Sequence, residues 1–259
     1  MKPDIVFEDD YMIACIKPYG VPAQSDKTFS ADMITLVKEY IYDRDGLTEE
    51  PYLAVINRLD RPVSGIMLFA KDEKTAAKLS DMIQDREISK FYQVIVRGFL
   101  DVPEGEWTDY LQHDKKSNQT KAVSKDTKGA KKAVLRYEVL DELDTDEGSV
   151  SYLLVELLTG RHHQIRCQMA SHGHPVWGDT KYASVSSDKK TGKKQKNGEK
   201  KKTSDKKGTD KKGKNGKDKY EIGLYSTRLE FTHPITGEEI ILHREPEGAA
   251  FEIADQMDW

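Results

Sequence analysis

Short apolar runs recur along most of the chain and predict a protein built mainly from strands. Each run has the length and the Val, Ile, Leu and aromatic content of a buried or half-buried strand. Between residues 113 and 132 the chain is polar and rich in lysine, which favours a hairpin or loops at the surface. The expected strands are residues 5–7, 11–16, 52–56, 66–70, 90–98, 134–140, 150–158, 222–231 and 239–242.

Three other segments carry helix signals. Ser30 is placed to cap a helix that runs to about residue 42, and Asp72 to cap a second one. Residues 162–172 form the third expected helix, with Gly173 at its C′ position. Because strands outnumber helices and short turns join many of them, we expect an α+β fold. Its central sheet is expected to be mixed but largely antiparallel, with flanking helices.

The cysteines and the N-terminus bear on the compartment. Cys15 and Cys167 give neither a disulfide framework nor zinc spacing, so a reducing cytoplasm is the simplest expectation. Residues 1–4 do not open a signal or transit peptide. No apolar run approaches the roughly 20 residues that a helix needs to span a bilayer, so we expect no membrane partner.

Charge is divided unevenly along the 259 residues. Residues 189–219 carry 15 lysines and four acidic residues, a net charge of +11, which leaves −15 on the rest of the chain. Residues 184–219 contain almost no large apolar side chain, so we expect a disordered, Lys-rich insertion. One catalytic domain is then expected from residues 1–183 and 220–259. Any RNA-binding cations of this acidic body must be concentrated locally.

The segment 56–65 holds one carboxylate, Asp60, between Arg58 and Arg61, and an expected strand lies on each side of it. Pro62 and Gly65 interrupt the apolar pattern, so these residues form a loop between the two strands. A carboxylate on a loop held by buried strands is well placed for chemistry. A structural Asp–Arg pair in a turn is the alternative interpretation of this segment alone.

Three more motifs follow in order. Residues 90–98 read K-x-Y-x-x-x-V-x-G, 159–166 read T-G-R-x-H-Q-I-R, and 178–182 read G-D-x-x-Y. Together with R-L-D-x-x-x-S-G at 58–65, they resemble the RluA family of pseudouridine synthases, in a form without an N-terminal S4 domain. The resemblance spans residues 4–183 and resumes near 222. It implies the fold of these synthases, with a catalytic cleft across the central sheet.

The resemblance also implies a reaction. Specific uridines in structured RNA, either rRNA or tRNA, would be flipped out of the helix and isomerised to pseudouridine. Asp60 would act at the ribose, Tyr92 at the base, and Arg166 would pair with Asp60. The reaction has no redox or phosphoryl-transfer step, so no cofactor or metal is required, and we expect a monomer. Substrate contacts are implied for Arg58, Arg61, Lys90, Arg161, Gln164 and Ile165.

The sequence departs from the family pattern at three positions. Asn57 stands where a histidine is usual before R-L-D, Gln168 where a histidine is frequent, and Ala183 where glycine is usual. The residues are compatible with two routes, in which Asp60 either attacks C1′ or removes a ribose proton.

Other function classes compete with this interpretation. An RNA-binding module with lost chemistry is disfavoured by the intact Asp60, Tyr92 and Arg166. A hydrolase would need a second carboxylate or a metal, and the motifs supply neither. The seven histidines form no recognisable first coordination shell; His162 and His163 are expected to face different ways on a helix.

Overall fold

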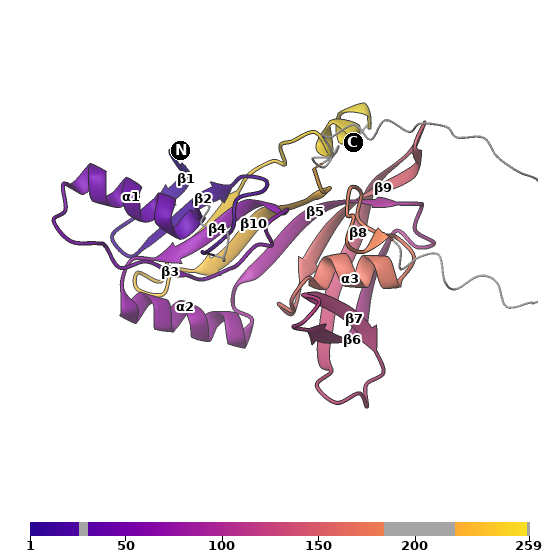
Figure 1. The fold of residues 1–259 in the computed structure, drawn as a ribbon, viewed down its shortest axis with the longest axis horizontal. Helices are drawn as coiled ribbons and strands as arrows, with labels where there is room; N and C mark the ends of the chain where they lie inside the picture. The colour runs from indigo at the N-terminus through magenta and orange to yellow at the C-terminus, as the bar shows by residue number, and fades with distance from the viewer. Residues whose placement is uncertain (26–30, 184–220, 258–259) are drawn as a thin grey trace, which may run out of the picture.

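A computed structural model describes residues 1–25, 31–183 and 221–257, and a single eleven-stranded sheet forms their framework (Figure 1). Helices cover the sheet as α1 (Met33–Asp45), α2 (Glu73–Asp85), α3 (Gln164–Ser171) and the 3₁₀ helix η2 (Phe251–Gln256). The strands are β1 (Asp4–Glu8), β2 (Met12–Lys17), β3 (Ala54–Val55), β4 (Ser64–Ala70), β5 (Ser89–Arg97), β6 (Glu104–Asp114), β7 (Gln119–Val123), β8 (Lys131–Thr145), β9 (Gly148–Leu157), β10 (Leu224–Thr232) and β11 (Glu239–His243).

The sheet runs in the order β1-β2-β4-β10-β5-β9-β8-β6-β7, with β3 on β4 and β11 on β10. Among the named pairs of described strands, only β4 and β10 are parallel. The expected α+β class with a mixed, mostly antiparallel sheet is therefore confirmed. Insertion of β10 between β4 and β5 brings the C-terminal part of the chain beside both motif-bearing strands.

Both faces of the sheet are buried near the edge that β1 and β2 form. Alternate residues of β2 point to opposite faces, so Ile13 and Cys15 pack with α1 while Met12 and Ala14 pack with α2. Figure 1 shows these two helices toward one end of the molecule and α3 beside β6 and β7 toward the other. There Cys167 of α3 belongs to a buried apolar cluster with Leu111 of β6. The central strands between the two ends carry the candidate site.

The structure corrects several predicted boundaries. Asp32, not Ser30, caps α1, because its Oδ1 accepts from the amide of Thr35 at 3.0 Å; Ser30 itself lies outside the described residues. Asp72 caps α2 as predicted. The third helix begins at Gln164 rather than 162, because His163 has φ = 50° and is not helical.

Two further expectations concern the extent of the elements. Strand β8 continues to Thr145, five residues beyond the predicted end at 140. The expected disorder of 184–219 falls outside the described residues. In the described part of the chain, the helices are too short or too polar to cross a membrane.

Candidate active site

The loop between β3 and β4 carries Asp60, and hydrogen bonds from Lys17 hold this loop in place. Lys17 is fully buried, and its Nζ donates to the carbonyls of Pro18, Val21 and Arg61 at 3.0, 2.7 and 3.0 Å. Burial lowers the pKa of Lys17 to about 7, and the Asp60 charge opposes this. The Arg61 carbonyl also accepts from the amide of Gly20 at 3.0 Å, so hydrogen bonds join the Asp60 loop to the segment that follows β2.

Asn57 fixes the start of the same loop. Its Nδ2 donates to the carbonyl of Ile66 at 3.0 Å, and its Oδ1 accepts from the amide of Leu68 at 2.6 Å. The side chain therefore bonds to β4 just where β3 ends. This gives a structural account of asparagine at a position where the family pattern has histidine.

Gly65 allows the close approach of β10 behind the loop. Its φ is +116°, and a Cβ at this position would overlap the backbone of Ser226. The same Ser226 is the register partner of Tyr92 on β5. Strand β10 therefore links the Asp60 loop to the strand that carries Tyr92.

Arg166 joins Asp60 to a second carboxylate. Its Nη1 lies 3.1 Å from Asp60 Oδ2, while Nε and Nη2 bind the two oxygens of Asp179 at 2.7 and 2.9 Å. Arg166 and Asp179 are buried, whereas the Asp60 side chain is 26% exposed. The contact that the resemblance implies for Asp60 and Arg166 is thus present in the structure.

Burial sets the protonation balance of Asp60. Desolvation raises the pKa of its carboxyl above the usual value, and the nearby Asp179 charge adds to this. Arg166, by charge and by hydrogen bond, and Lys181 oppose the rise without cancelling it. An ionised Asp60 in this position is a desolvated and reactive anion.

Tyr92 projects from β5 toward the same place. It is 6% exposed, and burial together with the Asp60 charge raises the pKa of its phenol. The phenol is therefore neutral at physiological pH. A neutral hydroxyl near Asp60 can pass a proton on but does not act as a strong base.

His163 was missed by the sequence interpretation, although it occupies the histidine of the T-G-R-x-H-Q-I-R motif. Its Nε2 lies 3.4 Å from Asp60 Oδ2, and its Nδ1 lies 2.8 Å from the Tyr182 hydroxyl. An ionised Asp60 carboxylate only accepts, so the facing Nε2 carries the proton of the neutral ring, and Nδ1 accepts from the Tyr182 hydroxyl, whose oxygen also accepts from the Thr120 amide at 2.9 Å. Burial lowers the pKa of His163 to about 2, with Arg166 adding to the effect. The neutral ring therefore turns its Nε2–H toward Asp60.

The ring positions of the two adjacent histidines also differ from the sequence prediction. The rings of His162 and His163 are stacked, with centroids 3.7 Å apart, rather than facing different ways on a helix. The left-handed backbone of His163, which precedes α3, explains the difference. Among the described residues, no group of three or more potential ligands could hold a metal ion.

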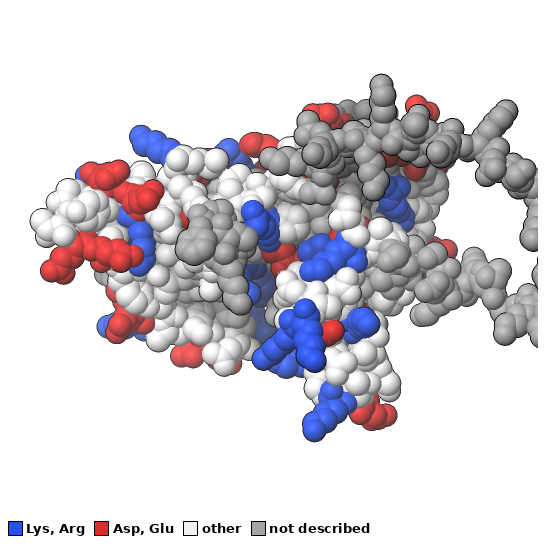
Figure 2. Space-filling view, in the orientation of Figure 1, with Lys and Arg blue, Asp and Glu red and all other residues white. Residues whose placement is uncertain are grey.

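Adjoining hollows open around Asp60, and the two larger ones measure about 710 and 580 Å³. Asp60 is the sole carboxylate among the described residues that line them. Figure 2 shows basic side chains gathered on this face around the middle of the sheet and over the β6–β7 hairpin. The cations that line the hollows are Arg58, Arg61, Arg86, Lys90, Arg161, Arg166 and Lys181.

The other residues with expected substrate contacts divide into two groups. Arg58 and Arg61 are exposed on the rim, although Arg61 Nε also donates to the Gly20 carbonyl at 2.9 Å. Lys90 is buried and donates to the Ile88 carbonyl at 3.2 Å, and Ile165 lines the smallest hollow beside Asp60.

Gln164 and Arg161 are engaged with the protein. Gln164 Oε1 accepts from Thr159 Oγ1 and from the Arg161 amide, while its Nε2 donates to the Val134 carbonyl. The Arg161 Nε donates to the Lys132 carbonyl at 2.9 Å. Both side chains therefore shape the turn before α3 as well as lining the hollows.

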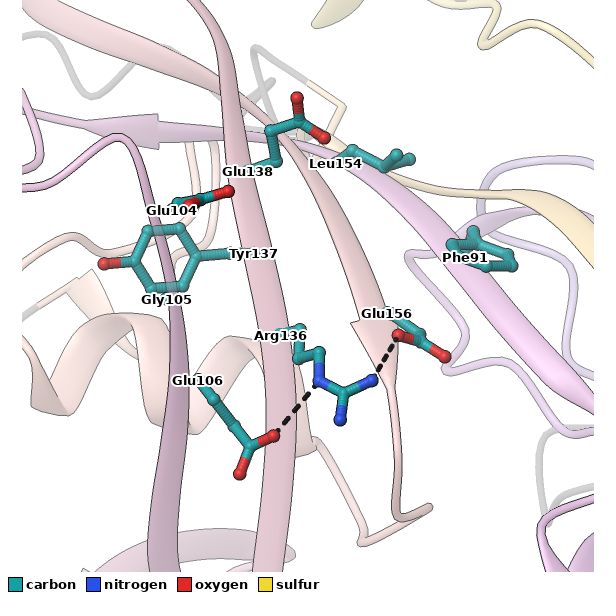
Figure 3. A pocket seen from close by; sticks show the side chains of 9 residues that line it. All are labelled: Phe91, Glu104, Gly105, Glu106, Arg136, Tyr137, Glu138, Leu154 and Glu156. Carbon is teal, nitrogen blue, oxygen red and sulfur yellow. Dashed lines mark hydrogen bonds and ion pairs between the residues drawn. The ribbon is translucent and has the colours of Figure 1, made fainter.

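A further hollow, of about 450 Å³, has the opposite charge character (Figure 3). It is lined by Phe91, whose side chain points to the sheet face opposite Tyr92. Arg136 bridges Glu106 and Glu156 across it, and Glu104 and Glu138 lie nearby. A wall with four carboxylates repels anions, so the cation-lined hollows around Asp60 are the better place for an anionic ligand.

The chain is similar to known proteins over most of its length. A family model described as RNA pseudouridylate synthase matches residues 11–171. The chain is 26% identical to tRNA pseudouridine synthase C of Vibrio parahaemolyticus, over 99% of this chain and 95% of the relative. It is 29% identical to the Pasteurella multocida protein of the same name, over 100% of this chain and 98% of the relative.

A solved structure shows the same fold. Human RNA Pseudouridylate Synthase Domain Containing 4 superposes with a TM-score of 0.70 at 19% identity, covering 99% of this chain and 94% of that one. The family model covers most of the chain and includes the Asp60 loop, the Tyr92 strand and Arg166. The chain therefore belongs to the RNA pseudouridylate synthase family, and it is an isomerase that converts uridine in RNA to pseudouridine.

Proposed function

We propose that the protein modifies uridine in tRNA. Relatives named tRNA pseudouridine synthase C align with nearly the whole chain, which supports a tRNA rather than an rRNA substrate. The observation that carries the catalytic assignment is the single carboxylate, Asp60, which is paired with Arg166 in hollows whose other charged lining residues are cations. Such a lining attracts phosphates to one place on an otherwise acidic body.

In this proposal Asp60 acts at the ribose. The C1′–N1 bond breaks, the uracil turns, C1′ bonds to C5, and the proton on C5 is replaced by one on N1. Asp60 either attacks C1′ or removes a ribose proton, and both routes require the ionised carboxylate. Arg166 favours that form, and His163 directs a neutral N–H at the same oxygen, Oδ2.

Tyr92 is proposed to serve the base. Its ring offers a stacking surface inside the site, and its neutral hydroxyl can carry the C5 proton toward a neighbouring acceptor. Arg58 and Arg61, on the rim, are proposed to fill the space that the flipped uridine leaves or to bind neighbouring phosphates. Arg161 and Lys90 line the same hollows, Gln164 holds the Arg161 turn, and Ile165 packs beside the base.

We further propose that the enzyme acts as a monomer in the cytoplasm. Asp60, Tyr92 and Arg166 come together within one chain, so no second copy is needed to complete the site. Both cysteines are buried free thiols, as suits a reducing compartment.

The substrate assignment is tested by chemical labelling of pseudouridine after incubation of the purified protein with unmodified tRNA and rRNA, because isomerisation leaves the mass unchanged. We expect labelling at defined uridines of tRNA and none in rRNA. Labelling of rRNA alone would overturn the tRNA assignment, and a parallel Asp60→Asn sample controls for contaminating activity.

A further inference from the structure

Three histidine rings form a continuous stack that leads away from Asp60. His163, which contacts Asp60, stacks on His162 with centroids 3.7 Å apart and planes inclined by 22°. His162 in turn stacks on His113 of β6, at 3.9 Å and 26°. The rings therefore extend as near-parallel plates from the Asp60 carboxylate to the surface, where His113 is exposed.

The two inner rings are fixed and uncharged. Thr120 Oγ1 donates to the His162 carbonyl at 2.9 Å, so it accepts from His162 Nδ1 at 2.8 Å. Burial lowers the pKa of His162 to about 4, with His113 adding to the effect. His163 is held at its own Nδ1 by the Tyr182 hydroxyl, which donates to it at 2.8 Å. These two neutral rings are held by hydrogen bonds, so they support one face of the His113 ring in a fixed position.

The outer ring faces a hollow suited to nucleic acid. His162 covers one face of His113, and the described residues make no ring contact with the other. His113 lines the hollow of about 580 Å³ together with Asp60 and four cations, Arg58, Arg61, Arg166 and Lys181. A flat ring beside cations is the arrangement by which proteins hold an unstacked base and its phosphate.

We propose that His113 stacks a nucleobase that neighbours the target uridine in the RNA, as the outer plate of the His113–His162–His163 stack. When the uridine is flipped toward Asp60, an adjacent base loses its stacking partner, and the imidazole face replaces it. The proposal rests on the proposed RNA substrate. It assigns a binding role to β6 and to two histidines that the isomerisation itself does not use.

The test compares two replacements of His113. His113→Gln keeps a polar side chain that can reach Asn118, which now lies 3.3 Å from Nε2, but it removes the ring. His113→Phe keeps a ring and removes the polar atoms. We expect His113→Gln to weaken RNA binding about tenfold with little change in saturating turnover, and His113→Phe to stay close to wild type. His243→Ala, an exposed histidine on β11, is the matched control.

RNA variants identify the base. The tRNA that the wild type modifies is made with an abasic ribose at each neighbour of the target in turn, and the Kd of each variant is measured. At one position the abasic RNA should bind wild type and His113→Gln equally, because the stacking base is absent. Melting curves confirm that the variants fold.

Separate outcomes overturn separate claims. Equal affinity of wild type and His113→Gln for every RNA would exclude the stacking, as would weakening by His113→Phe as large as that by His113→Gln. In both cases an active wild type would leave the substrate assignment intact. Failure of the wild type to form pseudouridine in tRNA would instead remove the proposed substrate. The comparison of His113 variants then runs on the RNA that the wild type does modify.

Discussion

Arg166 and Asp179 form a buried two-point ion pair, with Nε and Nη2 of the guanidinium 2.7 and 2.9 Å from the two carboxylate oxygens. This pair fixes the plane of the guanidinium, whose remaining nitrogen, Nη1, faces Asp60 at 3.1 Å. Asp179 also accepts from the amide of Lys181 at 2.9 Å, which anchors it independently. The orientation of the guanidinium that faces Asp60 thus depends on a second carboxylate, Asp179, which does not line the hollows.

Loss of Arg166 should therefore cost stability as well as activity. Arg166→Ala leaves Asp179 buried without its partner, and breaking such a pair destabilises by about 3–5 kcal/mol. Urea unfolding at pH 7 measures this. Arg136→Ala, which removes an exposed arginine between Glu106 and Glu156, is the control and should cost at most about 1 kcal/mol. Similar losses in the two variants would show that the Arg166–Asp179 pair contributes no special stability.

The pH dependence of activity is better tested in a variant that does not leave the Asp179 carboxylate buried without its partner. The double variant Arg166→Gln with Asp179→Asn removes both charges and keeps hydrogen-bonding side chains. Arg166 lowers the pKa of Asp60 more than Asp179 raises it, so the already raised pKa should rise further. Activity needs the ionised carboxylate, so the acid limb of the kcat/KM profile should move to higher pH. An unmoved limb in a folded, active double variant would show that these charges do not govern Asp60.

Asp60→Asn should abolish isomerisation and leave the fold intact. Asparagine has nearly the same shape but is neither nucleophilic nor basic, so we expect a loss above about 10³-fold in kcat/KM. The folded-state pKa of Asp60 is raised, so its ionised form opposes folding at pH 7 and the neutral amide should not lower Tm. Chemical labelling of pseudouridine and a melting curve check both points. Near-normal labelling by the folded variant would refute the role of Asp60.

Tyr92→Phe separates the ring of Tyr92 from its hydroxyl. The ring still offers its stacking surface, so RNA affinity should hold, but release of the C5 proton should slow because the relay is lost. Tritium release from C5-labelled RNA measures the step. Wild-type release rates in Tyr92→Phe would limit this residue to packing.

Much of the frame of the site is readable from sequence because its signals are local. The Asp72 cap, the strand with Tyr92 and the hairpin of β10 with β11 each follow from neighbouring residues. The ordered motifs also identify the Asp60–Arg166 contact, although 106 residues separate the two.

Contacts that depend on how distant segments pack could not be predicted from the sequence. The stacking of His113 on His162 depends on how the β6–β7 hairpin packs on the turn before α3, where Thr120 bonds to His162. The left-handed backbone of His163 gives no pattern in the sequence, so the helix was expected to begin two residues too early. The role of Lys17 likewise depends on carbonyl groups of two loops, which residue types do not reveal.

The last prediction concerns the Lys-rich tract 184–219, whose expected role follows from charge. It carries a net +11 within residues 189–219 against −15 on the rest of the chain. It follows directly after Tyr182 and Ala183, and Tyr182 contacts His163 of the site. A cationic segment joined at this point should offset the repulsion between the acidic body and RNA.

Replacing residues 184–219 with a short Gly/Ser linker should leave Tm and saturating turnover almost unchanged. RNA affinity should fall at low salt, and the slope of log Kd against log salt should become shallower, because fewer counterions are released on binding. A second linker of 36 residues with the lysines replaced by glutamine controls for length and should behave like the short one. Equal salt slopes for all three proteins would mean that the tract is an inert spacer. A large loss of Tm would instead place part of it within the folded domain.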